Sequence, residues 1–86
     1  MFYEFKEDQI MTIDLHNYTV DDAKHELQLF VKSAPKEIRE IIVIHGYRNG
    51  KALLNMVRKD FRHKRISQKV LSLNPGVTIF VLNKSF

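Results

Sequence analysis

The pattern of apolar and polar positions in the first half of the chain predicts a strand followed by a helix. From Met11 to His16, apolar and polar residues alternate, which is typical of a strand with one buried face. From Val20 to Lys32, apolar residues recur every three or four positions, as on the buried side of a helix. Thr19 is placed to cap this helix, and Pro35 follows its expected end.

The second half of the chain predicts a strand, a helix and a final pair of strands. Arg39 to His45 is the expected strand, and its four consecutive apolar residues, Ile41 to Ile44, indicate a central strand covered on both faces. A helix is expected from Lys51 to His63. After a connector at 66–69, strands are expected at 70–73 and 77–82, around an Asn-Pro-Gly turn at 74–76.

The predicted order β-α-β-α-β-β indicates an α/β (α+β) two-layer sandwich, with a four-stranded mixed sheet and two helices. We expect residues 11–86 to form a single domain after an N-terminal extension at 1–10. This extension carries Phe2, Tyr3, Phe5 and Ile10. They either lie across the sheet or contact a partner.

Composition excludes several classes of protein and site. The chain has no cysteine, which excludes disulfides, thiolate metal sites and a cysteine nucleophile. No apolar stretch approaches the ~20 residues that span a bilayer, so we expect a cytoplasmic protein without a membrane partner.

Charge is distributed unevenly along the sequence. Residues 1–45 carry five Lys and Arg against nine Asp and Glu, a net charge of −4, whereas residues 46–86 carry nine against one, a net charge of +8. The predicted second helix contributes a basic stripe of Lys51, Arg58, Arg62 and, just beyond its end, Arg65. Such a surface either binds the phosphates of a nucleic acid, which we favour, or only keeps a small protein in solution.

Two histidines follow predicted parallel strands, where the crevice beyond the carboxyl ends commonly binds ligands. Asp14 and His16 are two residues apart on a strand, so they share a face, and the carboxylate can orient the imidazole for acid–base chemistry. His45 ends the next strand. The alternatives are a solvated strand face with a histidine bonded to the next turn, or a metal site using all three residues, for which no ligand-spacing motif is present.

The loop after the second strand contains features of an anion site. Gly46 and Gly50 let the backbone approach a ligand, Arg48 and Lys51 add positive charge, and N–H groups at the start of the following helix attract anions. The spacing is not that of a P-loop and is a poor dinucleotide fingerprint. A simple left-handed turn before a helix explains the glycines but not His45.

These motifs resemble one family. Ile13-Asp14-Leu15-His16-Asn17 is similar to a Leu-Asp-Leu-His-Gly motif, and the segment Ile44-His45-Gly46-Tyr47-Arg48-Asn49-Gly50 is similar to an Ile-His-Gly-Lys-Gly-Thr-Gly motif. Both belong to the Smr (small MutS-related) domain, and the resemblance extends from about Met11 to Leu82. It implies a fold like the C-terminal domain of the third bacterial initiation factor. It also implies nuclease activity on DNA or RNA, in some members on ribosome-associated mRNA.

By position, the resemblance makes Asp14 and His16 the catalytic candidates, with His45 and the glycine loop facing the phosphate. Asn17 replaces a glycine, and Tyr47 and Arg48 replace a lysine and a glycine of the loop. A positive φ at Arg48 would cost about 1–2 kcal/mol. Arg48 also restores the lost cation, and Tyr47 offers a ring on which a base can stack.

We therefore predict a nucleic-acid-binding Smr-type endonuclease that cleaves RNA or nicks DNA, with Asp14, His16 and His45 at the catalytic site. The alternatives are a non-catalytic RNA- or ribosome-binding module, or a protein-interaction domain. A monomer or weak dimer is expected, and no cofactor is predicted, with a divalent metal left as an open alternative. The expected nucleic-acid-binding residues are Asn17, Gly46, Tyr47, Arg48, Gly50, Lys51, Arg58, Arg62 and Arg65.

Overall fold

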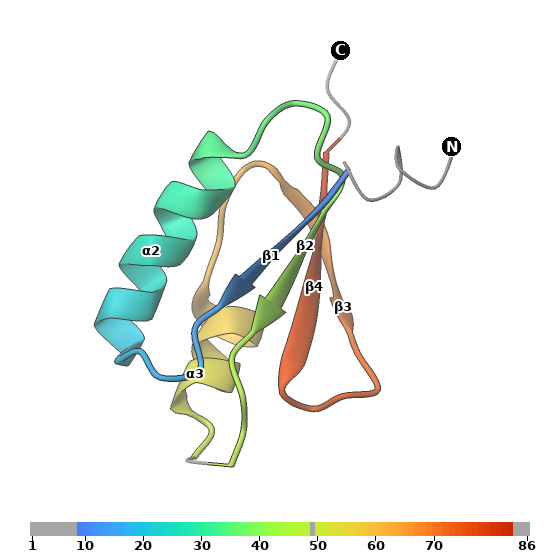
Figure 1. Ribbon diagram of the computed structural model, residues 1–86. Helices are drawn as coiled ribbons and strands as arrows, with labels where there is room; N and C mark the ends of the chain where they lie inside the picture. The colour runs from blue at the N-terminus through green and yellow to red at the C-terminus, as the bar shows by residue number, and fades with distance from the viewer. Residues whose placement is uncertain (1–8, 49, 84–86) are drawn as a thin grey trace.

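The computed structural model describes residues 9–48 and 50–83. They form two layers, with the helices packed against a sheet (Figure 1). In chain order the elements are β1 (Ile10–Asp14), α2 (Val20–Ser33), β2 (Glu40–Ile44), α3 (Ala52–Asn55), the π-helical turn η1 (Met56–Asp60), β3 (Ile66–Leu71) and β4 (Val77–Leu82). Most of the predicted extension at 1–10, including Phe2, Tyr3 and Phe5, lies outside the described residues, and Ile10 belongs to β1.

The sheet is mixed and has the strand order β1-β2-β4-β3. β1 and β2 are parallel, whereas β4 is antiparallel to both β2 and β3. Asp14 is in register with Ile44, so β1 and β2 end at the same edge of the sheet. The predicted four-stranded mixed sheet with two helical segments is confirmed. Within the described residues, no helix has the length and apolar character needed to cross a membrane.

The core lies between the helices and one face of the sheet. Ile41 and Val43 of β2 are fully buried there, together with Leu27 of α2 and Phe80 of β4. The other residues of β2, which alternate with Ile41 and Val43, point to the opposite face and are only partly buried. Within the described residues, therefore, only one face of β2 is fully buried, and the prediction that both faces are covered is not met.

The first helix agrees with its sequence prediction to within one residue. α2 begins at Val20, and the Thr19 side chain caps it by accepting a hydrogen bond from the Asp22 backbone N–H at 3.2 Å. Asp22 also places a carboxylate in the first turn, where the helix dipole favours negative charge. The helix ends at Ser33, two residues before Pro35.

The second helix is shorter than predicted. The expected helix from Lys51 to His63 consists of α3 and η1 and ends at Asp60. Phe61 leaves the helix because its ring is drawn into the core, where it stacks on Phe80 with ring centroids 5.7 Å apart. The Lys69 ammonium donates to the carbonyls of Val57 at 2.8 Å and Phe61 at 2.5 Å, which satisfies groups exposed by this early ending.

The third strand is longer than predicted. The expected connector at 66–69 belongs to β3, which ends at Leu71 rather than continuing to Leu73. A register shift between Ile66 and Gln68 interrupts the side-chain alternation that identifies a strand in sequence. The predicted turn at 74–76 is confirmed, and its Gly76 N–H donates to Asn74 Oδ1 at 2.9 Å.

Candidate functional site

A cleft of about 990 Å³ lies where the parallel strands β1 and β2 end. Four parts of the chain form it: the turn between β1 and α2, the loop after β2, the start of α3 and the turn between β3 and β4. Its lining residues are 16–20, 44–48, 50, 52, 53, 74, 76 and 77. The sequence therefore places its two histidine motifs at the rim of one cavity, as the parallel-strand argument predicts.

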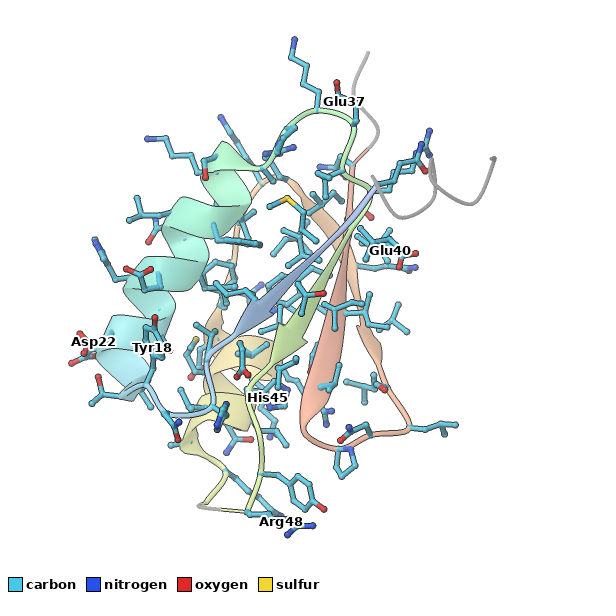
Figure 2. All side chains as sticks on the ribbon, in the orientation of Figure 1. Tyr18, Asp22, Glu37, Glu40, His45 and Arg48 are labelled. Atoms are coloured by element: carbon cyan, nitrogen blue, oxygen red, sulfur yellow. The ribbon has the colours of Figure 1, made fainter. Side chains whose placement is uncertain are left out.

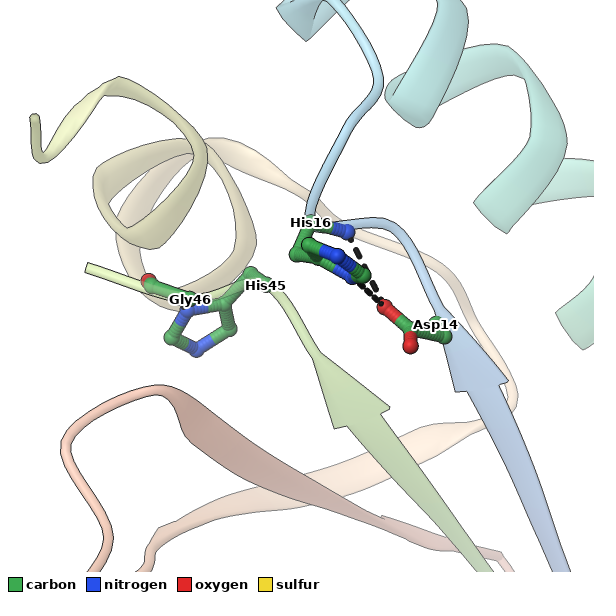
Figure 3. Close-up of polar contacts among 4 residues, drawn as sticks. All are labelled: Asp14, His16, His45 and Gly46. Carbon is green, nitrogen blue, oxygen red and sulfur yellow. Dashed lines mark hydrogen bonds and ion pairs between the residues drawn. The ribbon is translucent and has the colours of Figure 1, made fainter. Parts of the chain in front are cut away.

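Asp14 and His16 form a hydrogen-bonded dyad at this rim (Figure 3). His16 Nδ1 lies 2.5 Å from Asp14 Oδ1, and the backbone N–H of His16 donates to the same oxygen at 3.1 Å. These hydrogen bonds, the side-chain one above all, lower the pKa of Asp14 below its usual value of 3.8. The carboxylate is therefore ionised near neutral pH, and His16 Nδ1 carries the donated proton.

The orientation of the dyad leaves one imidazole nitrogen available. His16 lines the cleft, whereas Asp14 does not. Both side chains are about half exposed, at 51% and 50%. With the proton on Nδ1 and no other described residue bonded to Nε2, the Nε2 lone pair of His16 is free to accept a proton.

His45 does not join this dyad. It is only 2% exposed, and its Nε2 lies 2.9 Å from Thr78 Oγ1 while its Nδ1 lies 2.9 Å from the Gly46 carbonyl oxygen. We expected the side chains of Asp14, His16 and His45 to act together, but only Asp14 and His16 are hydrogen-bonded to each other. Figure 3 shows the His45 ring at the end of β2, with no hydrogen bond drawn to that pair.

The positions of the protons on His45 and Thr78 follow from the groups to which these side chains are bonded. The Gly46 carbonyl only accepts, so His45 Nδ1 is protonated and Nε2 accepts from the Thr78 hydroxyl. The hydroxyl oxygen accepts in turn from Arg58 Nε at 2.7 Å. Burial lowers the pKa of His45, and the nearby Arg58 charge adds to this effect, so the ring is neutral at neutral pH. Its position supports a structural role beneath the glycine loop.

The glycine loop approaches both neighbouring turns closely. The backbone N–H groups of His45 and Gly46 both donate to the Gly76 carbonyl at 2.9 Å, which joins the loop to the turn between β3 and β4. Gly46 has a φ of 76°, and a side chain there would lie 3.4 Å from His16 Cβ. Gly50 also has a positive φ, of 110°. No described non-glycine residue has a positive φ, so Arg48 carries none of the anticipated strain.

The cleft is lined by polar, aromatic and aliphatic side chains. The predicted binding residues Asn17, Tyr47 and Arg48 all line it, and no Asp or Glu is among the described lining residues. Lys51 is exposed beside the lining residues Gly50 and Ala52. The sequence interpretation missed Tyr18, which also lines the cleft; the available signal is an aromatic residue in the turn directly after the Asp-x-His motif.

The predicted basic stripe is not formed. Arg58 donates to Thr78 and to the Val77 carbonyl at 3.0 Å, and it does not line the cleft. Arg62 is exposed but lies beyond the end of η1, because the helix is shorter than expected. Arg65 is also beyond the helix and folds back onto the end of α2, where its guanidinium donates to the carbonyls of Val31 at 2.8 Å and Ala34 at 2.7 Å. Arg58 and Arg65 thus form hydrogen bonds within the fold.

The described part of the chain offers no cluster of metal ligands. Across residues 9–48 and 50–83, no three His, Cys, Asp or Glu side chains are grouped closely enough to hold a metal ion. The alternative in which Asp14, His16 and His45 share a metal is not supported by this geometry, because both ring nitrogens of His45 have hydrogen-bond partners.

Comparisons with known proteins agree with this architecture. The Smr domain profile matches residues 13–77. The crystal structure of the Smr domain of Thermus thermophilus MutS2 is similar, with a TM-score of 0.76 and 24% sequence identity, over 85% of this chain and 98% of that chain. No curated protein sequence matches. The family is related to nucleic-acid binding and to nucleases. From the profile match and the fold, this chain belongs to the Smr domain family.

Proposed function

We propose that this Smr domain binds nucleic acid in the cleft and cleaves phosphodiester bonds with the Asp14–His16 dyad. The observation that carries the proposal is the dyad geometry. The ionised carboxylate of Asp14 holds His16 Nδ1 at 2.5 Å, and His16 lines the cleft with Nε2 available. An oriented neutral imidazole is the commonest general base in proteins.

On RNA, the dyad supports a complete transfer step. His16 Nε2 takes the proton of a 2′-hydroxyl, and the freed oxygen bonds to the adjacent phosphorus. The bond from phosphorus to the 5′-oxygen of the next nucleotide breaks, and that oxygen receives the proton back from His16. The products are a 2′,3′-cyclic phosphate and a 5′-hydroxyl. Asp14 stabilises the imidazolium that exists between the two proton transfers.

The dyad assignment is tested with end-labelled RNA and DNA, each incubated with and without a chelator. Asp14→Ala and His16→Ala should lose cleavage by about 100-fold or more, while binding stays within a few-fold, because general acid–base catalysis contributes about 10²–10⁴-fold. His25→Ala is the matched control, since His25 is an exposed histidine of α2 outside the cleft. Equal cleavage by the wild type and both dyad variants would refute the proposal.

A second function, a non-catalytic nucleic-acid-binding module, is favoured by one observation. Asp14 Oδ1 accepts from both the backbone N–H and the ring of His16, so the pair also stabilises the end of β1 as a local turn. This function predicts salt-sensitive binding, reduced by Arg48→Ala, with no product from any strand. Cleavage that depends on His16 would exclude it.

A further inference from the structure

Two exposed tyrosines stand on different walls of the cleft. Tyr18 comes from the turn between β1 and α2, and Tyr47 comes from the loop after β2. They are 43% and 42% exposed, yet both line the cavity. Figure 2 shows Tyr18 at the start of α2 and Arg48, the neighbour of Tyr47, on the loop beyond the end of β2. The two rings therefore border one cavity from separate segments of the chain.

Hydrogen bonds anchor the backbone of the two segments that carry these tyrosines. The N–H of Tyr18 donates to the Leu15 carbonyl at 3.0 Å, and the following residue, Thr19, caps α2. Tyr47 follows Gly46, whose N–H is bonded to Gly76, and its ring packs near that turn, with Cδ1 3.4 Å from where a Gly76 Cβ would be. Rings on anchored backbone lose little conformational freedom when they bind a flat partner.

The charges around the rings favour a polyanion with flat groups. Arg48 is the cation among the described lining residues, and none of them is acidic. An aromatic ring beside a cation suits a strand whose phosphates meet the guanidinium while its bases stack. Bases within a duplex are already stacked on one another, so their faces are available only in single strands.

We propose that Tyr18 and Tyr47 make this cleft selective for single-stranded nucleic acid by stacking on unpaired bases. The inference rests on the proposed function, because it assumes that the cleft binds nucleic acid. It goes beyond that function by naming the strand form and the groups that select it. The stacking is insensitive to base identity, since every base presents a flat face.

The chain makes this stacking directly observable. It contains no tryptophan and three tyrosines, Tyr3, Tyr18 and Tyr47, so in a Tyr3→Phe background the intrinsic fluorescence reports only the two cleft rings. The full chain carrying Tyr3→Phe and His16→Ala, which prevents cleavage by the proposed dyad, is titrated with three RNA probes. These are a single strand, its duplex, and an abasic strand with the same number of phosphates.

We expect the single strand to quench the fluorescence and to bind at least about 10-fold more tightly than the duplex or the abasic strand. Tyr18→Ala and Tyr47→Ala should each weaken binding of the single strand by about 5-fold or more. The corresponding Phe variants should recover that loss, because they keep the ring. Leu29→Ala is the matched control, since Leu29 is an exposed apolar residue of α2 outside the cleft.

The outcomes separate the two proposals. Equal binding of the base-containing and abasic strands, without quenching, would overturn the stacking while nucleic-acid binding stands. Tighter binding of the duplex would overturn the strand selectivity in the same way. A failure of all three RNA probes, and of the corresponding single-stranded and duplex DNA, to bind would instead overturn the proposed function, and the stacking with it.

Discussion

The Thr78 hydroxyl is hydrogen-bonded to two polar side chains, those of His45 and Arg58. It is fully buried, donates to His45 Nε2 and accepts from Arg58 Nε. Thr78→Val keeps the shape but removes both interactions, so we expect the free energy of unfolding to fall by about 2 kcal/mol or more. Urea unfolding measures this change.

Thr12→Val is the matched control for that substitution, because Thr12 is exposed on β1. Its effect should stay within about 0.5 kcal/mol. Equal unfolding midpoints for the two variants would show that the Thr78 hydroxyl contributes nothing to stability.

The buried His45 ring also predicts how stability changes with pH. Its pKa is lowered in the folded protein from a usual value of 6.5, so just below pH 6.5 the unfolded chain binds more protons than the folded chain. The stability that neutral His45 contributes to the folded protein is fully present above pH 6.5. It is lost as the pH falls from there through the pKa of His45 in the folded protein. The free energy of unfolding, measured by urea at about pH 7 and about pH 5, should therefore decrease on acidification.

Replacing His45 isolates its share of this pH dependence. His45→Gln should flatten the decrease in part, because His63 also has a pKa lowered by burial and titrates in the same direction. His63→Gln is thus the matched control and removes only its own share. At lower pH, protonation of Asp14 removes stability as the pH falls below 3.8, because its folded pKa is also lowered. A decrease in the His45→Gln variant as steep as in the wild type would contradict the role assigned to His45.

At the scale of elements, the sequence predicts what alternation and helical spacing encode, and it fails where tertiary contacts decide. Thr19 and the spacing after it locate α2 to within one residue. The end of the second helix depends on Phe61 packing on Phe80, a contact between distant positions that no local pattern contains. The start of β3 is concealed by the register shift at Ile66.

The candidate site shows the same division. The positions of His16 and His45 after parallel strands correctly indicate the rim of a cleft. Which way each ring points depends on partners elsewhere in the chain. His16 turns to Asp14 two residues away, which sequence spacing reveals, whereas His45 turns to Thr78, thirty-three residues away. The sequence can therefore predict the dyad but not the burial of His45.

Two arginines predicted as binding residues should separate into different roles. The Arg65 guanidinium donates hydrogen bonds to carbonyls at the end of α2 that have no partner within the helix. Arg65→Met should therefore lower the free energy of unfolding by about 1–2 kcal/mol and leave the affinity for a single strand unchanged. Arg48 is exposed at the cleft, so Arg48→Met should weaken binding and leave stability within about 0.5 kcal/mol. Urea unfolding and strand titration check both; loss of affinity in the Arg65 variant alone would reverse the assignment.

At the scale of the whole molecule, the basic half of the sequence is only partly available to a ligand. Arg58, Arg65 and Lys69 donate to groups within the fold. Arg48 lines the cleft and Lys51 follows Gly50 of its lining, whereas Lys59, Arg62 and Lys64 are exposed outside it. The charge that meets a strand in the cleft is therefore much smaller than the net +8 of residues 46–86.

This distribution predicts a shallow salt dependence of binding. Each phosphate neutralised on a single strand contributes about −0.7 to the slope of log affinity against log salt, so contacts from Arg48 and Lys51 give a slope of about −1.4. If all nine basic residues after position 45 took part, the slope would be about −6. Titrations of a single strand over a range of salt concentrations measure it, and Arg48→Ala should reduce its magnitude by about 0.7, whereas Lys59→Ala, outside the cleft, should not. A steep slope, shared evenly among the basic residues, would indicate that the strand lies across the outer surface instead of in the cleft.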